Sequence, residues 1–170
     1  LYELWQSLYR QQFALTISTF MGVDVKYSDV DKHHLTYCVS NEFGSNKKAI
    51  VAALKAASDD GWEKFGDVNF IYDSSQDDKC DNLNASVMFD VRPIQGAPYL
   101  ARAFFPHYPR KYRNVMVDAS AFTYTKWALS DVLAHELGHA LGFRHEHARQ
   151  EAGRCVESGF GGEYDFRVVT

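Results

Sequence analysis

The sequence has no apolar run that approaches the roughly 18 residues of a membrane helix, so we expect no membrane span. It also lacks a basic excess, because 18 Lys and Arg face 22 Asp and Glu and the formal net charge is −4. Nucleic-acid binding needs a basic surface, so we expect no nucleic acid among its partners. Internal repeats and low-complexity tracts are missing too, and 170 residues suit one globular domain.

Cysteines are few and odd in number: Cys38, Cys80 and Cys155. In an exported protein an odd number points to a missing partner or a free thiol. We expect Cys38 to pair with Cys80, and Cys155 to pair with a residue beyond Thr170; three reduced, buried thiols are the alternative. The chain begins with Leu1 rather than Met and shows no signal peptide, so we expect that a leader has been removed or that the chain is a fragment.

Hydrophobic periodicity predicts a mixed α+β domain with helices packed on a sheet. The segments with a helical pattern are 1–13, 46–64 and 130–141. The short runs with strand composition are 35–39, 68–72, 85–91, 99–105 and 114–118. Residues 14–31 are predicted to form a strand or an extended arm. Ser130 is the expected N-cap of the last helix.

Three histidines predict a metal site at the end of that helix. His135 and His139 are four residues apart, so they lie on one helical face, one turn above the other. Gly142 can adopt the left-handed conformation and end the helix, and the chain can then bring His145 back as a third ligand. Three protein ligands leave one position open, which is typical of catalytic rather than structural zinc. We therefore expect one catalytic Zn²⁺ ion.

Glu136 follows the first histidine, where it can lie beside the metal without ligating it. There it could accept a proton from a zinc-activated water that attacks a substrate, and pass that proton to the leaving group. Glu136 is therefore the expected catalytic residue of a zinc-dependent hydrolase. The alternatives are surface histidines at a chance spacing, a zinc site without catalysis, and a hydrolase whose third ligand is Glu157 or Glu163.

The run from His135 to His145 resembles the signature of the metzincin zinc endopeptidases. Its continuation, Gly142-Phe143-Arg144-His145-Glu146-His147-Ala148-Arg149, is similar to the astacin family, and residues 35–92 and 99–105 look like bacterial astacin-like secreted peptidases. The resemblance implies a metzincin-like zincin fold, in which a twisted five-stranded mixed sheet carries a backing helix at 46–64 and an active-site helix at 130–141. It also implies a secreted, zinc-dependent endopeptidase with protein or peptide substrates, which we expect to be a monomer.

The same resemblance places a substrate-binding edge strand and a methionine turn. The edge strand is expected within 99–105, at Ala101, Arg102, Ala103 and Phe104, because an exposed edge can pair with an extended peptide. A catalytically inactive zinc-binding module that docks peptides on this strand is the alternative function. No methionine follows His145, so the methionine turn and its tyrosine are expected beyond Thr170.

Residues 1–28 precede the part that resembles the catalytic domain, which is expected over 29–170. We interpret them as a propeptide end or an N-terminal arm. The segment Phe20-Met21-Gly22-Val23-Asp24 is close to the Phe-x-Gly-Asp motif of astacin propeptides, although one extra residue separates Gly22 from Asp24. The resemblance makes Asp24 a candidate zinc ligand in a zymogen, and an ordinary loop aspartate is the alternative.

Overall fold

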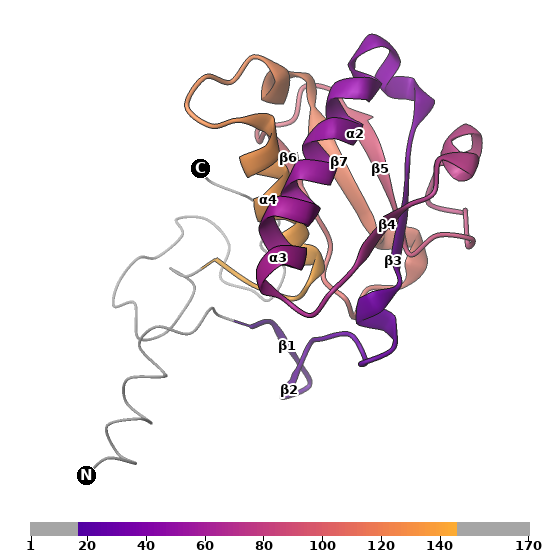
Figure 1. Cartoon of the computed structure of the whole chain (residues 1–170), viewed down its shortest axis with the longest axis vertical. Coiled ribbons are helices and arrows are strands. Elements are labelled where there is room, and N and C mark those ends of the chain that lie inside the picture. Colours follow the sequence, from indigo (N-terminus) through magenta and orange to yellow (C-terminus); the bar gives the residue numbers. More distant parts are fainter. Residues whose placement is uncertain (1–16, 146–170) are drawn as a thin grey trace.

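The computed structural model describes residues 17–145, and most of their strands form one mixed sheet (Figure 1). The sheet order is β4-β3-β5-β7-β6. Neighbouring strands pair in parallel throughout, except that β6 is antiparallel to β7. The strands are β3 (Leu35–Val39), β4 (Phe70–Tyr72), β5 (Phe89–Ile94), β6 (Ala101–Arg102) and β7 (Asn114–Asp118). This sheet confirms the predicted α+β, metzincin-like fold class.

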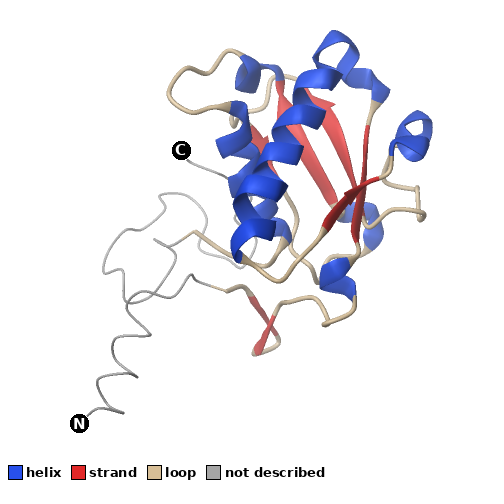
Figure 2. Cartoon of the chain, viewed as in Figure 1, coloured by secondary structure: helices blue, strands red, loops and turns tan. Residues whose placement is uncertain are grey.

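The main helices pack side by side on one face of the sheet, as Figure 2 shows. One helical segment consists of α2 (Lys47–Ala56), the π-helical turn η3 (Ala57–Trp62) and α3 (Glu63–Phe65), and α4 is Leu129–Ala140. Valines of the central strands and apolar residues of the helices form the core between the two layers. Residues with no measurable exposure there include Val39, Ile50, Val91, Val115, Val117 and Leu133. No helix of residues 17–145 has the length and apolar character needed to cross a membrane.

The predicted strands 35–39 and 114–118 are confirmed at both ends, and the others shift. The predicted strand 85–91 begins only at Phe89, because Asp81 and Asn84 accept hydrogen bonds from following backbone amides and hold the preceding chain in turns. The predicted strand 99–105 is reduced to β6. Phe104 leaves the sheet edge for the core, where its ring centroid lies 5.4 Å from that of Phe89.

A small hairpin precedes the sheet. It pairs β1 (Thr19–Phe20) with β2 (Val23–Asp24) through a turn at Met21 and Gly22, whose φ angles are 52° and 77°. Two positive φ values are typical of the tight turn that matches the twist of a hairpin. The predicted strand or arm over 14–31 is thus partly a hairpin, and the predicted helix over 1–13 lies outside the described residues.

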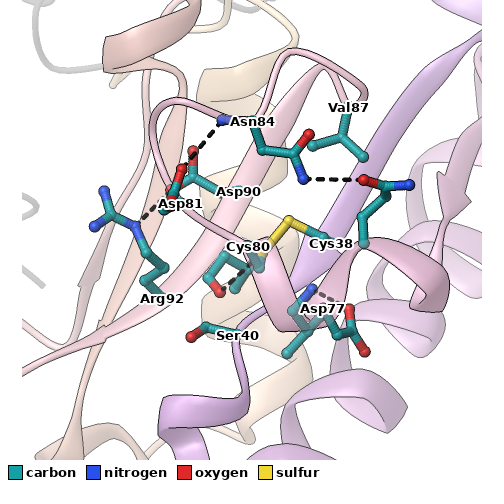
Figure 3. Close-up of a disulfide and its surroundings, with 12 residues drawn as sticks. Cys38, Ser40, Asp77, Cys80, Asp81, Asn84, Val87, Asp90 and Arg92 are labelled. Carbon is teal, nitrogen blue, oxygen red and sulfur yellow. Dashed lines mark hydrogen bonds and ion pairs between the residues drawn. A yellow bond between two sulfur atoms is a disulfide. The ribbon is translucent and has the colours of Figure 1, made fainter.

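A disulfide between Cys38 and Cys80 joins β3 to the loop after β4 (Figure 3). The predicted pairing is confirmed, and the alternative of three reduced thiols is wrong; Cys155 lies outside the described residues. Beside the disulfide, the buried Asp77 accepts a hydrogen bond from the Val39 amide at 2.9 Å. Its other oxygen lies 2.6 Å from the Lys47 ammonium. Covalent and polar links therefore fix this loop to the sheet.

A second carboxylate, Asp90 on β5, is fully buried. The Arg92 guanidinium donates to it at 2.6 Å and the Arg110 guanidinium at 2.7 Å. Arg110 also donates to the carbonyls of Val87 and Asp81. A buried charge needs partners of opposite charge, and the two guanidinium groups supply them. The hydrogen bonds of Arg110 also join β5 to the loops on either side of it.

Candidate metal centre

Helix α4 carries the first two histidines of the predicted site. It starts one residue before the predicted range, at Leu129, and the predicted N-cap Ser130 is wrong because it lies inside the first turn. Asp131 performs the capping instead, since its carboxylate accepts a hydrogen bond from the backbone N–H of Ala128 at 3.2 Å. An acid in the first turn also suits the positive end of the helix dipole.

The helix ends as the sequence predicts. The Phe143 amide donates to the Gly138 carbonyl and the Gly142 amide donates to the His139 carbonyl, which together form a Schellman motif. Gly142 has a φ of 106°, a conformation that glycine adopts without steric cost. The chain therefore reverses directly after α4 and returns His145 toward the helix.

The three predicted histidine ligands meet at one point. The Nε2 atoms of His135 and His145 are 3.0 Å apart, and each lies 3.1 Å from Nε2 of His139. Among the described residues they form the one group of three or more ligating side chains whose ligand atoms converge. Three nitrogens at these separations can all lie about 2.0–2.1 Å from one ion, which is the zinc–histidine distance. This convergence favours a metal site over surface histidines at a chance spacing.

The surroundings of His135 and His139 favour the neutral form of the imidazole, which is the form that binds a metal ion. Nδ1 of His139 lies 2.7 Å from the Phe143 carbonyl, and a carbonyl only accepts, so Nδ1 carries the proton and Nε2 presents a lone pair. Burial lowers the pKa of His139. Desolvation by neighbouring atoms, and then repulsion from the other two histidines, lowers the pKa of His135 to about 4. Part of His135 stays exposed, so solvent reaches the site. Converging lone pairs of this kind fit a divalent cation.

Glu136 points from the same helix but is almost completely buried, with 1% of its surface exposed. Neither carboxylate oxygen has a hydrogen-bond partner among the described residues. Burial raises the pKa of this carboxyl from 4.5 to about 8, against the opposing charge of Arg102. Burying a carboxyl without a hydrogen-bond partner destabilises the fold, so its presence here indicates a functional role. A group whose pKa lies near neutrality can both accept and donate a proton.

Trp62, in the π-helical turn, supports the metal centre but was missed in the sequence analysis. Its indole N–H donates to the Ala134 carbonyl at 2.7 Å, and its ring stacks on that of Phe143 at 5.2 Å. A Cβ added to Gly138 would lie 2.8 Å from the indole, so the glycine makes room for this ring. A glycine in the middle of a helix carries a cost of about 1 kcal/mol, and that is the signal that could have revealed a close neighbour.

The remaining predicted site residues do not belong to the cluster of three histidines. Asp24 is exposed on β2 and does not belong to the histidine cluster. Of the predicted substrate strand, Ala101 and Arg102 form β6 at the sheet edge, next to α4, whereas Ala103 and Phe104 are buried after the strand ends. Within residues 17–145, β6 pairs with β7 on one side and with no strand on the other.

The five-stranded sheet, the helix that carries two histidines and the turn that supplies the third define a domain of the metzincin class. The family model of the matrixin peptidases matches residues 29–152, which is more than half of the chain. The protein therefore belongs to the matrixin family, whose members are zinc-dependent peptidases. A comparison with curated proteins found no match. The match supports a metzincin-type peptidase and does not confirm the finer likeness to the astacins.

Proposed function

We propose that this protein is a zinc-dependent endopeptidase that hydrolyses peptide bonds in proteins. The observation that carries the proposal is the convergence of three imidazole nitrogens next to a buried carboxyl without a protein partner. His135, His139 and His145 would hold the ion. When bound, zinc acts as a Lewis acid that makes water more acidic and polarises a carbonyl group.

Residues around the metal centre would each have a separate role in catalysis. Glu136 accepts the proton of the attacking water and returns it to the leaving amine, a role that suits a carboxyl with a raised pKa. The Phe143 carbonyl keeps His139 in the tautomer that presents Nε2. The outer side of β6, at Ala101 and Arg102, offers backbone groups on which an extended substrate can add as another strand.

The finer features of the proposal rest on the sequence. We propose that the protein is secreted, which the disulfide between Cys38 and Cys80 supports because such bonds persist in oxidising compartments. An astacin-like subtype is supported by residues 146–149. A zymogen in which Asp24 ligates the metal is the competing hypothesis for the hairpin, and it would need this segment to move because the described hairpin leaves Asp24 exposed. Asp24→Ala should then raise basal activity, and unchanged activity would refute this role.

The central test is cleavage of an unstructured protein substrate, followed with and without a chelator. We expect chelation to abolish cleavage and added zinc to restore it. Glu136→Gln should bind zinc like the wild type and lose about 10²- to 10⁴-fold in kcat, because an amide is similar in shape but not basic. A Glu136→Gln variant that cleaves at the wild-type rate would refute the catalytic role. Zinc binding without any cleavage would instead favour a peptide-docking module.

A further inference from the structure

The hairpin β1–β2 precedes the region that matches the matrixin family, yet its backbone is joined to the turn that carries the third ligand. The Ser18 amide donates to the Gly142 carbonyl at 2.7 Å, and Ile17 forms an antiparallel bridge with Phe143. Gly142 and Phe143 follow Leu141, the C-cap of α4, and lie three and two residues before His145. Contact between the two ends of the described chain thus occurs at the metal centre.

The contact is close and continues at Val25, directly after the second strand of the hairpin. The Val25 amide donates to the Ser18 carbonyl at 2.7 Å, and both residues are buried, each with 6% exposure. A Cβ added to Gly142 would lie 2.2 Å from the Val25 carbonyl oxygen. Gly142 is therefore required for two reasons, its positive φ and the approach of the hairpin backbone. Such a fit shows that the hairpin is packed onto the turn.

Aromatic rings provide a second link from the hairpin to the histidines. Phe20 on β1 stacks on His107, with ring centroids 4.9 Å apart. His107 stacks on Phe105 at 6.3 Å, and Phe105 contacts the His139 ring edge-to-face at 5.7 Å. The hairpin therefore contacts the surroundings of two of the three ligands, through its backbone near His145 and through rings near His139.

We propose that the segment Ile17–Val25 is a positioning element of the metal centre, which clamps the turn Gly142–His145 and holds the third ligand in place. The proposal rests on the zinc site of the proposed function. In this proposal the segment is a permanent part of the catalytic unit and not an inhibitory leader. Releasing the hairpin should therefore weaken zinc binding and should not increase activity.

Two variants of one residue in the full chain test this. Ser18→Pro removes the N–H that donates to Gly142, whereas Ser18→Ala keeps it and serves as the matched control. Zinc affinity is measured by competition with a chelator of known affinity. Loss of groups that orient metal ligands costs about 10- to 100-fold in metal affinity, so we expect an increase of that size in Kd for Ser18→Pro. Ser18→Ala should bind like the wild type.

A second pair covers the case in which Ser18→Pro does not fold. Phe20→Ala removes the ring that stacks on His107, while Val23→Ala shortens an exposed apolar side chain of the same hairpin, with 69% exposure. We expect weaker zinc binding for the first and no change for the second. The Tm of the metal-free protein should change little in either, because neither residue belongs to the main core.

The outcomes separate the hypotheses. Wild-type zinc affinity in both Ser18→Pro and Phe20→Ala would overturn the positioning role, and so would tighter zinc binding or faster peptide cleavage, which would show an inhibitory segment. A wild-type protein that binds zinc but cleaves no peptide would refute the proposed function, while the comparison of zinc affinities would still decide the role of the hairpin.

Discussion

Gly138 and Trp62 form a tight contact whose energetics can be tested by changing the glycine to alanine. Alanine is favoured over glycine inside a helix by about 0.8–1.0 kcal/mol, so propensity alone predicts that Gly138→Ala stabilises the protein. The structure predicts the opposite sign. The added Cβ would lie 2.8 Å from Cζ2 of Trp62, which is too close for a non-bonded contact, so the indole must shift.

The size of the effect follows from what the indole would lose. It is held by a hydrogen bond to the Ala134 carbonyl and by the stack on Phe143, each of which contributes on the order of 1 kcal/mol. Overpacking of this kind costs about 1–3 kcal/mol. After subtraction of the helix gain, we expect Gly138→Ala to lower the free energy of unfolding by about 1 kcal/mol. With Trp62→Phe already present, the smaller ring leaves room and the same change should stabilise by up to about 1 kcal/mol.

The assay is denaturant unfolding of the wild type, both single variants and the double variant, all with chelator present so that metal binding does not contribute. The expected coupling between the two positions is about 2 kcal/mol, well above the few tenths found for independent sites. A Gly138→Ala variant that is more stable than the wild type, or two changes whose effects simply add, would refute the argument that Trp62 occupies the space beside Gly138.

Three further perturbations have outcomes that the structure predicts. Asp90→Ala leaves the Arg92 and Arg110 guanidinium groups without their carboxylate and should cost about 3–5 kcal/mol in chemical unfolding, and a loss below 1 kcal/mol would contradict the buried pairing. Replacing Cys38 and Cys80 by serine opens a link across 42 positions and should cost about 4 kcal/mol relative to the oxidised wild type, and reduction of the wild type should cost a similar amount. Zinc at about 1,000 times its Kd should stabilise the wild type by about 4 kcal/mol and raise its Tm, whereas His139→Ala should show no such rise.

The parts that the sequence predicted well are those governed by short-range patterns. Strand composition predicted both ends of β3, and alternation predicted both ends of β7. The four-residue spacing of His135 and His139 placed both histidines on one helical face. Gly142 predicted the end of α4 because its left-handed conformation is a local property. Such features depend on neighbours in the chain, so they can be recognised without the tertiary structure.

The parts that were missed depend on contacts between distant segments. The π-helical turn that directs Trp62 toward α4 has no local pattern, and only the unexplained Gly138 hinted at it. The shortening of the edge strand to β6 follows from the burial of Phe104 against Phe89, which a strand pattern cannot reveal. Docking of the hairpin on the turn after α4 likewise joins segments that are remote in sequence.

The bridge between Ile17 and Phe143 also joins residues that are far apart in the order of synthesis. Ile17 is translated before the five strands of the sheet, and Phe143 is translated after them. Contacts between such distant residues form late in folding, since the entropy of closing the loop must first be overcome. A nascent chain that lacks its last part would therefore carry a folded sheet with a metal centre that is still open.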